Sequence, residues 1–429
     1  MKIVYLITGS GGSFYCGNCY RDMLFMRAIR KVEGIKAAAI PLYLPPGQAV
    51  DVGFDNKVFF GAISMYLREK VSIFKNMPDF LDRFFSLPPF LKLAANQAGT
   101  TRTEGLENLT LNMIEGDNAF KQNEVKRLVK YLEATGKPDI IHLSNALILG
   151  LARQLKKHLD VKIVCSLLNE DDWIEEMAEP FRSKAWELIA REANNVDRFV
   201  TPSRYYKDFF ISKTGLSSET IDIVPLGIDA EFPQAPKNAT RPPAIGFFCR
   251  MNSFNGFDKI TDAFIELKKQ NIIPNLKLHF CGGYTSDDKP FISKQLRKIK
   301  VNGFIKDVKT FHDFQGCRKA DFFNSVDVIS VPVRKYDGFG LYILEANLAG
   351  VPVVQPATGA FPEIIAAIGG GLIYEPDTVE TLVEALTKIM TNNELRQSLA
   401  KTGFEKVRSE FSLDKMSCEL EELYNSINP

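Results

Sequence analysis

The stretch YDGFGLYILEANLAGVPVV, residues 336–354, contains a loop, a helix and the start of a second apolar run. The apolar residues within 341–349 recur with the helical period, and Gly350 and Pro352 end that helix. A β-branched run at 327–331 comes shortly before the loop. A strand, a helix and a further strand in this order predict a parallel sheet wrapped by helices.

The loop of this stretch brings two carboxylates to the beginning of the helix. Asp337 lies just outside the helix and Glu345 about one turn inside it, so both border the same end of the sheet. A carboxylate that accepts two hydrogen bonds suits the vicinal hydroxyls of a ribose or a sugar ring, and the N–H groups of residues 338–340 suit a phosphate or sugar oxygen. Glu345 is either a solvated helix carboxylate or, because its helical neighbours are leucines, a buried one that needs a partner.

The same alternation of short apolar runs and helical segments continues along most of the chain. Strands are expected at 2–7, 37–41, 140–143, 162–166, 198–201 and 221–224 in the first half, and at 244–249, 277–281, 308–311, 327–331, 351–354 and 371–374 in the second. Because the pattern starts twice, the sequence predicts an α/β protein of two doubly wound, Rossmann-like lobes facing across a cleft. Ligands of such sheets bind outside the carboxyl ends of the strands.

Composition places the domain boundaries. Residues 226–243 are rich in Pro and polar residues, which is typical of a linker. We therefore expect an N-terminal, acceptor-side lobe at 1–225 and a C-terminal lobe at 244–409. The last segment, 410–429, has Ser412 as an N-cap and apolar residues at helical spacing, and it predicts a closing helix that returns to the N-terminal lobe.

Residues 51–116 do not show the alternation of short apolar runs and helical segments. It is rich in Phe, Lys and Arg, and Pro88 and Pro89 divide it into short pieces. We expect a helical insertion that packs on the protein or covers the cleft. Contact of its aromatic and basic side chains with a membrane surface is the less favoured alternative.

Composition also excludes several classes of protein. The 429 residues are 45% hydrophobic and 24% charged, which is typical of globular proteins. Lys and Arg number 53 and Asp and Glu 52, so a net charge of +1 predicts no nucleic-acid partner. The 7 Cys without a repeating framework predict reduced thiols and a cytoplasmic protein. No apolar stretch is long enough to span a bilayer, so peripheral association with the inner face of the membrane is the alternative.

A glycine-rich loop, GSGGSFYCGNCYRD at residues 9–22, follows the first strand. Gly11, Gly12, Ser13 and Asn18 are candidates to hold a phosphate or an acceptor near the N-terminus of the next helix. The loop lacks the third Gly of the dinucleotide fingerprint and the Walker A lysine, so a tight turn without a ligand is the alternative.

Cys16 and Cys19 in the same loop are spaced like a redox pair or half of a zinc site. A second pair of ligands is missing, and the 4 His are dispersed along the chain. We therefore expect no metal site and no catalytic dithiol.

Residues 336–354 resemble the signature of retaining glycosyltransferases with the GT-B fold, specifically glycosyltransferase family 4, in which an acidic residue precedes a Glu by eight positions. Further similar segments are VPLGID (224–229), FFCRMNSFNGFD (247–258), HFCGG (279–283), SVDVISVPV (325–333) and TGAFPEII (358–365), with PDIIHLSNA (138–146) in the first lobe. The resemblance spans nearly the whole second lobe. It implies a nucleotide-diphosphate sugar held mainly by that lobe.

The resemblance also implies roles for matching positions. Glu345 looks like the residue that grips the nucleotide ribose, and Asp337 with the backbone of 338–340 looks like the contact to the sugar hydroxyls. Arg250 resembles the arginine that neutralises the leaving diphosphate, with a structural ion pair as the alternative. The implied set is Arg250 and Asp337 as catalytic residues and Glu345, Gly338, Phe339, Gly340, Asn255, Gly282 and Gly283 as donor-binding residues.

The chain departs from the family pattern in three places. The pattern usually has Lys five residues after the arginine, where this chain has Asn255, and losing one cation is expected to cost about 2 to 4 kcal/mol of transition-state stabilisation. Asp337 is one methylene shorter than the more usual Glu. The His often found after strand 162–166 is absent, and Asn169 and Glu170 stand there as candidates on the acceptor side.

The first functional hypothesis is a cytoplasmic, metal-independent, retaining glycosyltransferase of hexosyltransferase type. It moves a sugar from a nucleotide-diphosphate sugar to a carbohydrate or lipid-linked acceptor and uses no cofactor. The alternative is a GT-B-fold binding or scaffold protein with a degraded donor site, which Asn255 and the missing His motivate. An NAD-dependent oxidoreductase is disfavoured because no acidic residue ends the second strand.

Overall fold

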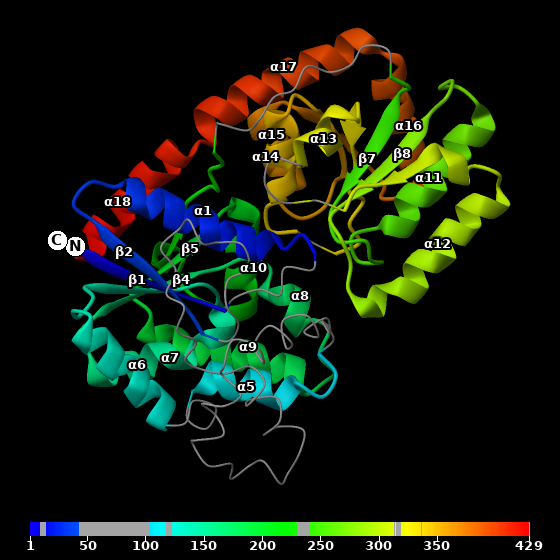
Figure 1. Cartoon of the computed structure of the whole chain (residues 1–429). Coiled ribbons are helices and arrows are strands. Elements are labelled where there is room, and N and C mark those ends of the chain that lie inside the picture. The colour runs from blue at the N-terminus through cyan, green and yellow to red at the C-terminus, as the bar shows by residue number, and fades with distance from the viewer. Residues whose placement is uncertain are drawn as a thin grey trace. The chain divides into compact units, whose positions relative to one another are not determined.

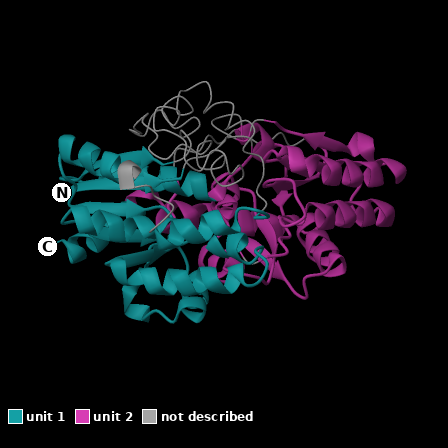
Figure 2. Cartoon of the chain, turned by 90° about the horizontal axis from the view of Figure 1, so that it is seen from below, with its two compact units in different colours: residues 1–12, 18–225, 416–429 teal, residues 13–17, 226–415 magenta. Residues whose placement is uncertain are grey.

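The computed structural model describes residues 1–8, 14–42, 103–116, 122–229, 241–312, 314, 319–335 and 337–428. The chain forms two compact units, which Figure 2 shows in different colours. The first comprises residues 1–12, 18–225 and 416–429, and the second comprises residues 13–17 and 226–415. Most of the region 51–116 and of the linker 226–243 lies outside the described residues.

The first unit contains a parallel sheet of six strands in the order β2-β1-β3-β4-β5-β6 (Figure 1). Its strands are β1 (Lys2–Ile7), β2 (Lys36–Pro41), β3 (Ile140–Leu143), β4 (Lys162–Ser166), β5 (Arg198–Thr201) and β6 (Ile221–Ile223). The central strands are almost continuously apolar and buried, as expected where helices cover both faces of a sheet.

Helices of the first unit cover this sheet and supply the rest of its core. They are α1 (Gly17–Lys31), α5 (Glu107–Glu115), α6 (Gln122–Ala134), α7 (Gly150–His158), α8 (Glu170–Ile174), α9 (Phe181–Glu192), α10 (Arg204–Thr214) and α18 (Leu413–Ile427). Ser412 caps α18, because its Oγ accepts a hydrogen bond from the N–H of Lys415 at 3.2 Å. Ser417 of α18 donates from its Oγ to the carbonyl of Ala28 in α1 at 2.8 Å, so this helix packs within the first unit.

The second unit contains a parallel sheet in the order β12-β11-β10-β7-β8-β9. Its strands are β7 (Ala244–Phe248), β8 (Lys277–Cys281), β9 (Val308–Thr310), β10 (Val328–Ile329), β11 (Val353–Pro356) and β12 (Gly371–Tyr374). Counted along the chain within this unit, the order is 3-2-1-4-5-6, which is that of a dinucleotide-binding Rossmann sheet. The direction of winding changes between β7 and β10.

The helices of the second unit lie on both sides of its sheet in Figure 1. They are α11 (Phe257–Gln270), α12 (Lys289–Val301), α13 (Lys319–Asn324), α14 (Leu341–Leu348), α15 (Phe361–Ile368), α16 (Val379–Thr391) and α17 (Asn393–Glu410). Within the described ranges of the chain, no helix is both long enough and apolar enough to cross a membrane.

The predicted fold class is confirmed, because both sheets are parallel and their strands alternate with helices. Six strands differ from their predicted bounds, four of them by a single residue and two, β10 and β11, by more. The strand expected at 327–331 ends at Ile329, because the N–H of Val331 donates to the side-chain Oε1 of Gln355 at 3.0 Å. The strand expected at 351–354 begins at Val353, after Pro352, which has no N–H to donate. The region 51–116 ends in a regular helix, α5.

Candidate functional site

The residues predicted to bind the donor follow the two strands at which the winding of the second sheet changes. Arg250 comes directly after β7, and the loop 337–340 with α14 comes after β10. These strands are neighbours in the sheet. In open α/β sheets, ligands bind outside the carboxyl ends of the strands at such a switch point. The topology therefore brings both segments to the place where this fold holds ligands.

Glu345 is completely buried on α14 and accepts a hydrogen bond at each carboxylate oxygen. The Nζ of Lys319 donates to Oε1 at 2.6 Å, and the hydroxyl of Tyr15 donates to Oε2 at 2.6 Å. The ammonium of Lys319 compensates the negative charge that burial would otherwise disfavour. Glu345 is therefore a paired, buried carboxylate and not a solvated helix residue.

Arg250 is buried and forms a two-point ion pair with Asp288. Its Nε donates to Oδ2 at 2.8 Å and its Nη2 to Oδ1 at 3.0 Å, while Nη2 also donates to the Oγ1 of Thr285 at 3.0 Å. Thr285 and Asp288 cap the short helix 286–288 by a reciprocal capping box, which fixes the carboxylate. The ion pair considered from the sequence is present, and the contact of Arg250 with a leaving diphosphate stays a prediction.

Phe14 and Tyr15, which belong to the second unit, contact both of these charged residues. The guanidinium of Arg250 lies over the Phe14 ring, with its carbon 4.8 Å from the ring centre. Tyr15 reaches Glu345, and its ring packs on Phe248 with centroids 4.9 Å apart. Arg250 and Glu345 therefore contact two consecutive residues of the chain.

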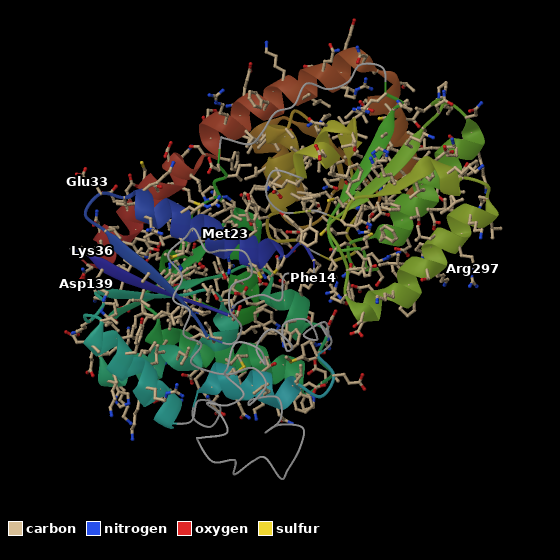
Figure 3. The ribbon with its side chains drawn as sticks, in the orientation of Figure 1. Phe14, Met23, Glu33, Lys36, Asp139 and Arg297 are labelled. Carbon is tan, nitrogen blue, oxygen red and sulfur yellow. The ribbon has the colours of Figure 1, made fainter. Side chains whose placement is uncertain are left out.

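The backbone of the same segment pairs with the two glycines predicted to bind the donor. The N–H of Tyr15 donates to the carbonyl of Gly282 at 2.7 Å, and Phe14, which is labelled in Figure 3, forms an antiparallel bridge with Gly283. Gly282 has φ of 127°, and a Cβ there would lie 2.3 Å from the carbonyl oxygen of Cys249. Glycine is therefore required at this position by the close approach of two backbones.

Asp337 caps the beginning of α14. Its Oδ1 accepts hydrogen bonds from the N–H of Phe339 at 2.9 Å and of Gly340 at 2.8 Å. Gly340 has φ of 77°, and a Cβ there would lie 2.7 Å from Cε1 of Phe361. Two of the N–H groups predicted to bind a ligand thus donate to Asp337 in this structure, and the Phe339 side chain is buried. Gly338 is the third residue of the loop 338–340 that the sequence predicted to bind the donor.

Asn255 supports the loop that carries Arg250. Its Nδ2 donates to the carbonyl of Arg250 at 2.9 Å, and its N–H donates to the Oδ1 of Asn252 at 2.9 Å. The turn closes at Gly256, which has φ of 71°, and a Cβ there would lie 1.9 Å from the carbonyl oxygen of Pro332. Asn255 therefore holds the backbone of Arg250 in place of presenting a cation.

The candidates on the acceptor side lie in the first unit. Gly11, Gly12 and Ser13 lie outside the described residues, whereas Asn18 is in the first turn of α1 and its buried Oδ1 has no hydrogen-bond partner among the residues that the structure describes. Asn169 precedes α8 with φ of 60°. These residues therefore belong to a different unit from Arg250 and Glu345.

Glu170 is buried within the first unit. Its Oε1 accepts from the N–H of Ala146 at 3.1 Å and its Oε2 from the hydroxyl of Tyr206 at 2.7 Å. Burial raises the pKa of the Glu170 carboxyl above its ordinary value, although these hydrogen bonds oppose the shift. The side chain is enclosed by protein partners.

The first unit also contains a buried polar cluster that no sequence motif indicated. We call it the His142 cluster, and it consists of Tyr5, Asp22, His142, Ser166 and Tyr424. His142 bonds through Nε2 to the Oγ of Ser166 at 2.8 Å and through Nδ1 to the hydroxyl of Tyr424 at 2.7 Å. The hydroxyl of Tyr5 donates to the Oδ1 of Asp22 at 2.7 Å. Burial, followed by the nearby charge of Arg21, lowers the pKa of His142 to about 3, so the imidazole is neutral.

Cys16 directly precedes α1 and Cys19 lies in its first turn, and neither forms a disulfide with another described residue. Among the residues that the structure describes, no group of three or more His, Cys, Asp or Glu is arranged to hold a metal ion. In the second unit, charged and aromatic residues lie around Phe14 and Tyr15. We call five of them the Glu345 cluster: Tyr15, Arg250, Asp288, Lys319 and Glu345.

Comparison with known families agrees with this geometry. The model of "Glycosyl transferases group 1" matches residues 229–406, and that of "Glycosyltransferase Family 4" matches residues 108–232. The chain belongs to the group 1 glycosyltransferases. The first match contains Arg250, Lys319 and Glu345 of this glycosyltransferase.

Curated relatives of the glycosyltransferase are distant. A lipopolysaccharide core biosynthesis mannosyltransferase of Rhizobium meliloti is 25% identical over 51% of the chain and 66% of the relative. A D-inositol 3-phosphate glycosyltransferase of Stackebrandtia nassauensis is 27% identical over 53% of each chain. The matched part of the chain thus spans between about half and two thirds of these relatives.

Solved structures share the fold of the glycosyltransferase. HepE of Anabaena, solved with UDP and glucose, superposes with a TM-score of 0.72 at 15% identity and covers 99% of this chain and 100% of its own. Sucrose-phosphate synthase of Thermosynechococcus elongatus gives a TM-score of 0.70 at 15% identity, over 100% and 99% of the two chains. These similarities establish the GT-B fold predicted from the sequence.

Proposed function

We propose that this glycosyltransferase transfers a hexose from a nucleotide-diphosphate sugar to a carbohydrate or lipid-linked acceptor, with retention of the anomeric configuration. The observation that carries the proposal is the convergence of Arg250 and Glu345 on Phe14 and Tyr15 at the switch point of the second sheet. A cation and a carboxylate at this point match the two ends of a nucleoside diphosphate.

Glu345 binds the ribose in this proposal. A carboxylate has about four lone-pair positions, so its two oxygens accept hydrogen bonds from the two ribose hydroxyls. Burial removes competing water and makes each of these bonds count for more than at the surface. The position of Glu345 inside α14 gives the carboxylate a rigid support.

Arg250 stabilises the departing diphosphate. Asp288 and Thr285 hold its guanidinium from one side, so the side chain is oriented before the donor arrives. Charge that develops on the leaving oxygen is then met by a fixed cation, which is the most effective form of electrostatic catalysis. The acceptor attacks from the face that the diphosphate leaves, which retains the configuration.

The names of relatives guide the choice of substrates. The matched proteins include a lipopolysaccharide core mannosyltransferase, D-inositol 3-phosphate glycosyltransferases and a capsular polysaccharide glycosyltransferase. HepE was solved with UDP-glucose. These names support hexose donors and sugar-containing acceptors for the present chain.

Thermal unfolding with UDP-, GDP- and ADP-hexoses tests the proposal. One donor should raise the unfolding temperature, because a ligand that binds only the folded state stabilises it. NMR of the product formed with that donor should show the anomeric configuration of the donor, and EDTA should leave the rate unchanged. Inversion would exclude the retaining mechanism, and loss of turnover in EDTA would exclude metal independence.

A binding or scaffold protein is the second candidate. The hydrogen bond from Asn255 to the carbonyl of Arg250 favours this candidate, because no cation then stands at position 255, where the family pattern has a lysine. In that case no donor in the panel is turned over, by transfer or by hydrolysis, even when one of them binds. Measurable turnover of any bound donor would exclude this candidate.

A further inference from the structure

Lys319 is a buried cation of the Glu345 cluster that the family signature does not include. It is the first residue of α13, and its side chain is 11% exposed. Its Nζ lies 2.6 Å from Oε1 of Glu345, the carboxylate that the proposed function assigns to the ribose. A lysine at this depth is costly unless an anion accompanies it.

The charged residues of the Glu345 cluster explain why a buried lysine is needed when an anionic ligand binds. Among the described residues, Arg250 and Lys319 are the positive groups of the cluster and Asp288 and Glu345 the negative ones, and Asp337 caps the helix that carries Glu345. A nucleoside diphosphate adds further negative charge. Arg250 is already paired with Asp288, and residue 255 is an asparagine, so among the described cations of the cluster Lys319 is the one best placed to balance the ligand.

Binding of a ribose would change the partners of Glu345. The ribose hydroxyls donate to the two oxygens that now accept from Lys319 and Tyr15. An ammonium that loses part of its carboxylate contact remains buried and needs another anion. The phosphates are joined to the same ribose, so the ligand that competes for Glu345 also brings the replacement partner.

We propose that Lys319 is the second cation of the donor site and contacts the diphosphate, in place of the lysine that the family pattern has at position 255. The inference rests on the proposed function, because it takes Glu345 as the ribose contact. It assigns Lys319 to substrate binding. The opposing view is that Lys319 only keeps the Glu345 carboxylate charged and oriented.

Matched pairs of probes separate these two roles. Binding is measured by titration for uridine with UDP, guanosine with GDP and adenosine with ADP, using the pair whose diphosphate binds the natural protein. Lys319→Met should weaken the diphosphate by about 10- to 100-fold more than it weakens the nucleoside. A lysine that acts only through Glu345 should weaken both probes equally, which would overturn the inference.

A second background removes the ion pair itself. In Glu345→Gln, Lys319 no longer pairs with a carboxylate at position 345, so adding Lys319→Met cannot act through that ion pair. We expect the double variant to bind the diphosphate at least about 10-fold more weakly than Glu345→Gln alone. An unchanged affinity would overturn the inference.

Lys269→Met is the control for loss of one positive charge from the second unit, because Lys269 is exposed on α11. It should leave both probes within about twofold. Lys319→Arg should retain most of the diphosphate affinity. An affinity of Lys319→Arg as low as that of Lys319→Met would contradict a simple need for positive charge. If no diphosphate binds the natural protein, the proposed function fails with the inference. If a diphosphate binds and Glu345→Gln weakens its binding, the proposed function stands. If Lys319→Met then weakens the diphosphate no more than the nucleoside, only the inference fails.

Discussion

The His142 cluster and the Glu345 cluster are both buried at parallel sheets, yet they use polar groups differently. In the first, a neutral imidazole is held between the hydroxyls of Ser166 and Tyr424. In the second, charged groups pair with one another and with aromatic residues of the segment 14–15. The central residue of the His142 cluster is uncharged, whereas the Glu345 cluster contains several charged residues.

This difference indicates two roles. The hydrogen bonds of a neutral imidazole to two hydroxyls need no outside partner and stabilise a unique packing of α18 against the sheet. Paired ions are costly to bury and gain little over apolar packing, so their retention at a switch point points to a ligand. The predictions below test whether the Glu345 cluster works on substrate and the His142 cluster on stability.

The largest effect is expected for Arg250→Met. Losing the fixed cation should lower kcat for the bound donor by about 100- to 1,000-fold, because the leaving diphosphate is then unsupported. Arg334→Met is the control, since Arg334 forms a two-point pair with Asp258 at 2.6 and 2.7 Å in the same unit. Initial rates at saturating donor measure both. A similar fall in the two variants would remove the special role of Arg250.

Glu345→Gln should weaken UDP, or the diphosphate that binds, by about 10- to 100-fold, because a charged acceptor for the ribose becomes a neutral one. Glu170→Gln is the matched change in the first unit, where burial already raises the pKa of the carboxyl. Its diphosphate affinity should be unchanged. Calorimetric titration compares the two, and equal affinities would refute the ribose assignment.

One substitution, Tyr→Phe, should act differently in the two clusters. Tyr424→Phe removes a partner of His142 and should lower the free energy of unfolding by about 1 to 2 kcal/mol. Both tryptophans of the chain, Trp173 and Trp186, lie in the first unit, so their fluorescence during urea unfolding measures its stability.

Tyr15→Phe should leave that unfolding curve unchanged and strengthen the diphosphate by about 3- to 10-fold. The Tyr15 hydroxyl now competes with the ribose for Oε2 of Glu345, and the variant removes the competitor. Weaker binding in this variant would show that the hydroxyl itself helps to hold the ligand.

The last prediction concerns the dependence of stability on pH. His142 has a folded-state pKa of about 3, below the ordinary value of 6.5, so the unfolded state binds a proton between these values and the folded state does not. Stability should therefore fall as pH falls from 6.5 toward 3, by at most about 1.4 kcal/mol per unit from this residue. His142→Gln should reduce this slope in tryptophan-detected unfolding, and an unchanged slope would contradict the assignment to His142.

Much of the fold followed from local pattern. Apolar runs and helical periods placed the strands, because a residue's face in a strand or helix depends on its near neighbours. Gly350 and Pro352 likewise marked the end of α14, which stops at Leu348. The shortening of β10 was not predictable, since it depends on the side chain of Gln355 from another strand.

The candidate site was predicted in part. The position of Glu345 one turn inside a helix after a strand could be read from spacing, and the leucines around it indicated burial. The aromatic pair Phe14 and Tyr15 was read only as part of a glycine-rich loop. Its role depends on pairing with Gly282 and Gly283, and nothing near residue 14 in the sequence signals that pairing.

The amino-acid order alone was enough to assign the α/β class, the resemblance to the family and Glu345 as a candidate, because each rests on short-range periodicity or spacing. Tertiary structure decided which groups meet: Tyr15 with Glu345 across 330 positions, Lys319 with the same carboxylate, and His142 with Tyr424 across 282 positions. Such contacts depend on how sheets and helices pack, and packing joins residues whose sequence neighbours carry no trace of one another.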